Sequence, residues 1–152
     1  MLTKKRQLDL IRNVWLFERC SQRELSEIQS AVTPLHVPAG RVLAEQGEIG
    51  REFIIVVDGK ARVTREGTEI AVLGPGSFFG EMSLLDGKPR AASVTTLEPT
   101  ELLVLTSAEF RSVVNSMPSV DRKIMTVLAE RLRDIEAKYV PAHERSTQAH
   151  IG

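Results

Sequence analysis

The spacing of apolar and polar residues divides the chain into two helical flanks around a strand-rich middle. In the first flank, two apolar stripes at helical spacing predict two helices. The second helix is expected to begin at the capping box formed by Ser21 and Glu24 and to end at Pro34. The stripe residues are Leu8, Ile11, Trp15, Leu25, Ile28 and Val32.

The middle of the chain predicts short strands separated by turn signals such as Asp58-Gly59 and Glu66-Gly67. Apart from Gly152, every glycine lies between Gly40 and Gly87. Strands this short and evenly spaced favour an antiparallel barrel or jelly roll over a doubly wound sheet. The predicted strands are Leu35–Pro38, Arg41–Glu45, Phe53–Val57, Ala61–Arg65, Glu69–Leu73, Ala92–Leu97 and Glu101–Leu105.

The second flank predicts two further helices. A second capping box at Thr106 and Glu109 starts the first of them, and Pro118 ends it. A longer helix is expected from about residue 119 to residue 139, with one apolar arc. That arc packs on the chain's own roll or on a second copy, and the sequence leaves both open. Its residues are Val120, Ile124, Leu128, Leu132, Ile135 and Tyr139.

Composition and charge narrow the classes of function. Apolar residues make up 42% of the 152 residues, which is enough for a core and excludes wholesale disorder. Twenty basic and twenty acidic side chains cancel, so no general positive field exists to hold nucleic acid. No apolar run reaches the length of a membrane span or a signal core, so we expect a cytoplasmic protein. The single cysteine, Cys20, excludes an internal disulfide.

Residues 78–94 break the strand pattern with the sequence FFGEMSLLDGKPRAASV. Gly80 allows a backbone close to a ligand, and the next residues suffice for about one helical turn, whose free amides favour an anion. Pro89 sets an extended entry for Arg90, whose guanidinium can bind a phosphate beside that turn. Glu81 suits a ligand that also donates a hydroxyl, as a sugar phosphate does. The alternative is a structural ion pair between Glu81 and Arg90.

This segment resembles the phosphate-binding cassette of cyclic nucleotide-binding domains, whose pattern is Phe-Gly-Glu, a few apolar residues, then Pro-Arg-Ala-Ala-Ser/Thr-Val. The chain matches every element, and the likeness extends from about Leu10 to Leu132. Catabolite activators, protein kinase A regulatory subunits and bacterial cyclic-nucleotide-gated channels contain such sensor domains. The family's turn signature is also similar to Pro38-Ala-Gly40, Gly47-Glu48 and Val57-Asp-Gly59.

The resemblance implies an α+β, mainly β fold. We expect an eight-stranded antiparallel β-roll, jelly-roll-like, with N-terminal helices and C-terminal hinge and lid helices. The predicted divisions are a cyclic nucleotide-binding domain at 1–140, its roll at about 35–105, its cassette at 78–94, its C-terminal helices at 107–139, and a polar, flexible tail at 141–152.

The resemblance also implies roles for single residues. Arg90 would pair with the exocyclic oxygens of the cyclic phosphate, and Ala91 would give its amide to the same group. Glu81 would accept from the ribose 2′-hydroxyl, with backbone contacts from Gly80 and Met82. In the family, a hydroxyl residue after the arginine goes with cGMP preference. Because Ala91 has no hydroxyl, cAMP is the expected ligand and cGMP the alternative.

The base is expected to lie against apolar side chains of the roll. Val63 and Ala71 are candidates for that wall, because they are inward positions on facing strands. Arg131 falls on the apolar arc of the last helix, at an angle between Val120 and Ile124. It either stacks on the purine as a lid or extends along the arc to water, and both interpretations stay open.

We therefore predict a non-catalytic sensor, without metal or cofactor, that closes its C-terminal helix on binding a cyclic nucleotide. One alternative is the sensor half of a catabolite-activator-type transcription regulator that lacks its helix-turn-helix. Another is a cupin-type metalloenzyme, which needs clustered histidines where the strands offer His36 alone. Expected partners are the nucleotide, a protein effector in trans or outside this chain, and a second copy through the last helix. Direct nucleic-acid binding and a membrane span are not expected.

Overall fold

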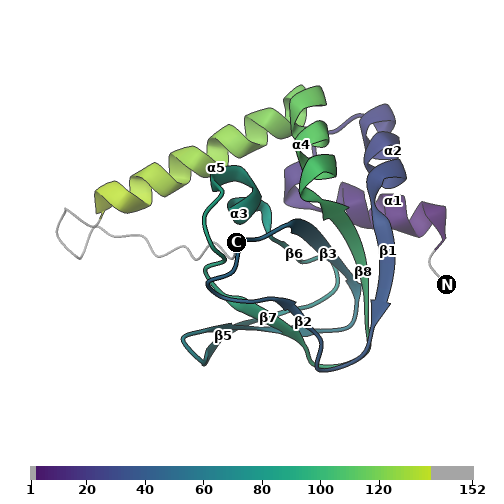
Figure 1. The fold of residues 1–152 in the computed structure, drawn as a ribbon. Helices are drawn as coiled ribbons and strands as arrows, with labels where there is room; N and C mark the ends of the chain where they lie inside the picture. Colours follow the sequence, from purple (N-terminus) through teal and green to yellow (C-terminus); the bar gives the residue numbers. More distant parts are fainter. Residues whose placement is uncertain (1–2, 138–152) are drawn as a thin grey trace.

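A computed structural model describes residues 3–137 and shows a β-roll with helices gathered along one side (Figure 1). Within that range, the side chains of Met82 and of several residues from Val127 onward lie outside the description. The helices are α1 (Lys4–Arg12), the 3₁₀ helix η1 (Trp15–Phe17), α2 (Gln22–Ala31), α3 (Glu81–Asp86), α4 (Ser107–Ser116) and α5 (Pro118–Ala137).

The roll consists of two four-stranded antiparallel sheets, with the orders β1-β8-β3-β6 and β2-β7-β4-β5 among the described residues. The predicted mainly β architecture, an antiparallel roll flanked by helices, is confirmed, and each of the seven predicted strands overlaps an observed one. The strands are β1 (Thr33–Val37), β2 (Val42–Ala44), β3 (Glu52–Asp58), β4 (Ala61–Arg65), β5 (Thr68–Leu73), β6 (Phe78–Phe79), β7 (Ser93–Thr96) and β8 (Thr100–Thr106).

The shortest strand, β6, was not predicted as a strand. We expected the cassette to leave the strand pattern from Phe78 onward, but Phe78 and Phe79 pair with Ile55 and Ile54 of β3. A two-residue strand is too short to produce an alternating pattern that could be recognised in the sequence.

Helix ends follow the sequence signals with two exceptions. The stretch predicted as one helix through Leu8, Ile11 and Trp15 is divided, because α1 ends at Arg12 and Trp15 begins η1 after an extended Val14. Both capping boxes are present, and each N-cap hydroxyl accepts from the backbone N–H three residues later. α5 begins at Pro118, the helical position where a missing N–H costs least. The prediction that α2 extends to Pro34 was wrong: α2 ends at Ala31, because Val32 is already extended. Pro34 lies in β1, which is an edge strand, where proline is tolerated.

Two apolar cores meet at the sheet that contains β3 and β8. Alternate residues of these strands face opposite sides, so the run from Phe53 to Val57 is buried on both faces, and this explains why it is apolar without interruption. The helical side buries Phe53, Ile55, Val57, Leu103 and Leu105 with α1, α2, α4 and α5. The roll interior buries Ile54, Val56, Leu102 and Val104 with residues of the second sheet.

The arc of α5 contributes to the helical core. Val120 and Ile124 are buried there against the chain's own residues. Of the other arc positions, the side chains of Leu128, Leu132 and Ile135, together with Tyr139, lie outside the described residues, as does the predicted tail at 141–152. α5 therefore starts on the helical core and continues past α3 (Figure 1).

Candidate functional site

The predicted cassette forms a short helix between two strands of different sheets. α3 is bounded by two glycines in the left-handed region, Gly80 at φ 105° and Gly87 at φ 67°. The N–H of Gly87 donates to the Ser83 carbonyl and closes the helix at 3.0 Å. Gly80 is required for space as well, because a Cβ there would collide with the Glu52 carbonyl oxygen and approach Arg90 Nη1 at 2.8 Å.

Arg90 returns from α3 into this narrow space. Its side chain is buried, with 5% of the residue exposed, and its Nη2 donates to the Glu52 carbonyl at 2.8 Å. Its Nη1 is buried and has no hydrogen-bond partner among the described residues. Gly50 lies against the guanidinium, since a Cβ on Gly50 would be 2.5 Å from Arg90 Cζ and Nε. The guanidinium therefore lies between two glycines.

The backbone of Arg90 is held by the loop that precedes β3. Its N–H donates to the Glu48 carbonyl at 2.7 Å, and its carbonyl accepts from the Gly47 N–H at 2.9 Å. An isolated antiparallel bridge joins Ile49 to Pro89 next to these bonds. The backbone of Arg90 is thus held by main-chain bonds to Gly47 and Glu48, and its guanidinium is held by the Glu52 carbonyl. Together these bonds fix the direction of the side chain.

The charge of Arg90 is only partly compensated by the protein. Burial lowers the pKa of the guanidinium, while the carboxylates of Glu52 and Glu81 oppose that shift. Arginine nonetheless stays protonated at neutral pH, so the site contains a buried cation. A buried donor without a partner is costly, and an anion that accepted from Nη1 would remove that cost. The arrangement can therefore bind a phosphate oxygen.

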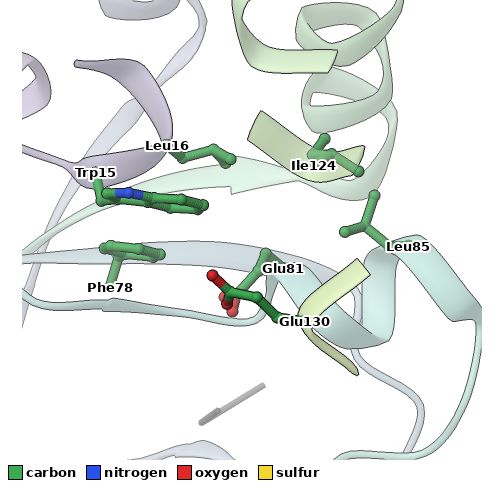
Figure 2. Close-up of a pocket in the computed structure, with 7 residues that line it drawn as sticks. All are labelled: Trp15, Leu16, Phe78, Glu81, Leu85, Ile124 and Glu130. Atoms are coloured by element: carbon green, nitrogen blue, oxygen red, sulfur yellow. The ribbon is translucent and has the colours of Figure 1, made fainter. Parts of the chain in front are cut away.

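Glu81 is the first residue of α3 and is buried, with 8% exposed. It lines a cavity of 260 Å³ between η1, β6, α3 and α5. Figure 2 shows its carboxylate and that of Glu130 from α5 directed toward the same space below the Trp15 and Phe78 rings. The cavity is completed by Leu16, Leu85 and Ile124. Glu81 of the cassette thus shares a cavity with residues of α5, the helix that was predicted to act as the lid.

The other predicted residues lie around the same insertion. Ala91 is exposed and adjoins Arg90, and Met82 belongs to α3. Val63 and Ala71 are register partners on β4 and β5, the first fully buried and the second partly buried in the roll interior, which fits their expected inward orientation. The side chain of Arg131 lies outside the described residues.

Three contributors to the site were not predicted from the sequence. Gly50 was interpreted only as part of a turn, and the Glu52 carbonyl carries no sequence signal. Arg65 of β4 donates from Nε to the Ala91 carbonyl at 3.2 Å, a contact across 26 residues. A second glycine three residues after Gly47 was the one available hint, because two glycines so close suggest a crowded backbone as well as a turn.

Other kinds of site were searched in the described residues. No group of three or more histidine, cysteine, aspartate or glutamate side chains among residues 3–137 is arranged to hold a metal ion. His36 is exposed on β1, 4.0 Å from Glu101. No helix in the same range combines the length and apolar character that a membrane span requires. Burial, aided by Glu24, raises the pKa of the Cys20 thiol to about 11, opposite to the shift of an activated nucleophile.

Sequence comparison with known proteins agrees with the resemblance inferred from the cassette. A cyclic nucleotide-gated potassium channel from Rhizobium etli is 35% identical over 132 residues, which are 83% of this chain and 37% of the channel. The cyclic AMP receptor protein of Thermus thermophilus is 39% identical over 104 residues, which are 65% of this chain and 48% of that protein. The chain thus spans less than half of each of these relatives.

Solved structures give the same result. The catabolite activator protein of Thermus thermophilus superposes with a TM-score of 0.70 at 35% identity, covering 82% of this chain and 61% of that one. The regulatory domain of Toxoplasma gondii PKA, crystallised with cAMP, gives 0.68 at 29% identity over 72% and 44%. The family model for the cyclic nucleotide-binding domain matches residues 34–117, more than half of the sequence. The resemblance predicted from the cassette is confirmed: this chain belongs to the cyclic nucleotide-binding domain family.

Proposed function

We propose that this domain is a non-catalytic, cytoplasmic sensor that binds cAMP at the cassette. One observation carries the proposal: the buried guanidinium of Arg90 has one donor satisfied by the Glu52 carbonyl and a second, Nη1, without a partner among the described residues. A cyclic phosphodiester carries a single negative charge and would accept from Nη1 without adding a second charge to desolvate.

The remaining contacts of the nucleotide are proposed from the family pattern. Ala91 gives its amide to the phosphate, and Glu81 accepts from the ribose 2′-hydroxyl beside the backbone of Gly80 and Met82. The base lies against Val63 and Ala71, whose register pairing supports a common wall. Arg131 of α5 is the proposed lid residue, and Arg131→Met tests this role. A weaker affinity for cAMP would support stacking of the guanidinium on the base, and an unchanged affinity would support extension of the side chain to water.

The preference for cAMP over cGMP is proposed from Ala91. A hydroxyl at that position would reach the guanine amino group, and alanine offers none. The similarity to a cyclic AMP receptor protein and to a kinase regulatory domain solved with cAMP supports the same choice. cGMP remains the competing ligand to be measured.

Binding would be communicated through α5. This helix is joined to η1 by Lys123, whose Nζ lies 2.5 Å from Glu18 Oε1 and 4.6 Å from the centre of the Trp15 ring. Glu81 of the cassette and Glu130 of α5 line one cavity, so a shift of α3 on ligand binding changes the surroundings of α5. We propose that α5 then closes over the base through a hinge around residues 109–118. The nucleotide can drive this only through its difference in affinity for the two states.

The described residues do not identify an output for the sensor. We propose that residues 1–140 form the sensing unit and that it acts on a protein effector, in trans or in the same protein. A second candidate is the sensing half of a transcription regulator, favoured by the likeness to the catabolite activator structure. The α5 surface is the proposed contact with a second copy. Sedimentation with and without cAMP, followed by a DNA-binding assay, separates these candidates.

Calorimetric titration with cAMP, cGMP and AMP tests the function. We expect cAMP to bind more tightly than cGMP, and AMP to bind weakly because its second negative charge finds no partner. Arg90→Ala should weaken cAMP binding by about 2–5 kcal/mol, as for other truncated buried charge pairs. Arg62→Ala, which removes an exposed arginine of β4, is the matched control. Equal affinities in wild type and Arg90→Ala would refute the phosphate assignment.

A further inference from the structure

The turn between β4 and β5 contains a backbone conformation that its residues do not favour. Glu66 has φ 52°, the one positive φ of a non-glycine residue among residues 3–137, and Gly67 follows at 77°. Two consecutive positive φ values are the pattern of a type I′ turn, whose first position favours Asn, Asp or Gly. A glutamate in this conformation is strained, and such strain persists only where neighbouring contacts hold it.

Gln46, in the loop between β2 and β3, supplies those contacts. Its Nε2 donates to Glu66 Oε1 at 2.6 Å, and its Oε1 accepts from the Glu66 N–H at 2.9 Å. One carboxamide thus binds both the side chain and the backbone of the strained residue. The backbone N–H of Gln46 also donates to Ser93 Oγ at 2.9 Å, at the first residue of β7. Gln46 therefore joins the turn to the end of the cassette.

The residue before Glu66 makes a second connection to the same place. Arg65 donates from Nε to the Ala91 carbonyl at 3.2 Å. The segment Arg90–Ser93, here called the cassette arm, is thus bonded by Gly47 at Arg90, by Arg65 at Ala91 and by Gln46 at Ser93. The hairpin turn is therefore bonded to the arm directly through Arg65 at Ala91 and indirectly through Gln46 at Ser93, although 26 residues separate Arg65 from Ala91.

We propose that Gln46, Arg65 and Glu66 are positioning residues that hold the cassette arm in its binding geometry before the ligand arrives. The inference rests on the proposed function, since it assigns them to the Ala91 amide as a phosphate donor. Gln46, Arg65 and Glu66 are half-buried or exposed, so their bonds add little to global stability. Their effect is local, because an arm that is ordered in the free protein loses less entropy on binding.

Substitutions that remove single bonds test the proposal. Arg65→Met keeps the length of the side chain and removes the donor, and Gln46→Leu removes both bonds to Glu66. Each is expected to raise the Kd for cAMP about five- to tenfold, mainly through faster dissociation, with an unchanged midpoint of thermal unfolding. Arg62→Met removes the same charge from an exposed position of the same strand and should leave the Kd within about twofold. If Arg65→Met and Arg62→Met raised the Kd for cAMP equally, the loss of a positive charge would explain the effect and the proposal would be overturned.

Glu66→Gly separates positioning from folding. Glycine relieves the positive φ, so the domain should unfold at the same or a higher temperature, yet cAMP should dissociate faster because the carboxylate bond to Gln46 is lost. A variant that gains stability and keeps the wild-type dissociation rate would contradict the proposed role of Glu66.

Hydrogen exchange in the nucleotide-free protein provides a readout that does not depend on the proposed function. The Arg90 amide, which donates to the Glu48 carbonyl at the start of the arm, should exchange about fivefold faster in Arg65→Met and Gln46→Leu than in wild type, and at the wild-type rate in Arg62→Met. Unchanged exchange in the first two variants overturns the positioning role. If wild-type protein fails to bind cAMP, the proposed function is refuted, while the exchange experiment still decides whether these residues order the arm.

Discussion

The contact between Gly50 and Arg90 allows the geometry of the site to be tested with one added methyl group. Gly50 does not lie in the left-handed region, so alanine is compatible with its backbone. The new Cβ would lie 2.5 Å from Arg90 Cζ and Nε and 2.8 Å from Ser83 Cβ. These separations are far below ordinary carbon contacts of about 3.5–4.0 Å, so the guanidinium has to move. Gly50→Ala therefore displaces Arg90 without removing its charge.

The magnitude follows from the bond that the displacement breaks. When the guanidinium leaves the Glu52 carbonyl, a charged hydrogen bond of about 1.5–3 kcal/mol is lost or weakened. We expect cAMP binding to weaken by about 1–3 kcal/mol, which is roughly fivefold to 150-fold in Kd. Crowding at Ser83 should also lower the free energy of unfolding by about 1–3 kcal/mol.

Calorimetry with cAMP and urea unfolding measure the two effects separately. Gly74→Ala is a matched control, because its Cβ would meet no atom within 4 Å and its φ is not positive. It should change neither the Kd nor the unfolding midpoint measurably. If Gly50→Ala binds cAMP with the wild-type Kd while Arg90→Ala does not bind, the described packing of the guanidinium is wrong, and so is the reasoning that the two glycines position it.

Three further predictions concern other parts of the molecule. Ala91→Thr should narrow the ratio of the cGMP and cAMP dissociation constants in competition titrations; an unchanged ratio would exclude this position as the discriminator. Because its pKa is raised to about 11, Cys20 should be alkylated at pH 8 at least tenfold more slowly than a free thiol, with a rate that rises tenfold per pH unit up to about pH 10. A plateau near pH 9 would contradict the raised pKa. Phe53→Ala should destabilise the domain by about 3–5 kcal/mol in urea unfolding, since the buried ring contacts Phe17, Phe78 and Phe110. A loss below 1 kcal/mol would mean that these rings do not organise the core.

Local sequence signals determined much of the architecture. The capping boxes at Ser21 and Thr106 fix helix starts through bonds between residues three positions apart, so no distant part of the chain is needed to recognise them. Glycines between strands mark turns for the same local reason. The run from Phe53 to Val57 was predicted as a strand, and the structure adds that it is buried and that each of its faces belongs to a different core. Strand β6 was missed because two residues carry no periodicity.

The cassette was recognisable from its residue types, because a glycine, a glutamate and a proline-arginine pair at these spacings suit the binding of a sugar phosphate. The tertiary structure decided how Arg90 is held. The Glu52 carbonyl, Gly50 and the turn containing Arg65 come from segments 26 to 40 residues away from Arg90 or its neighbour Ala91 in the chain, whereas Gly80 belongs to the cassette itself. A carbonyl group is the same in every residue, so its role depends only on where folding brings it, and no pattern in the sequence can indicate that.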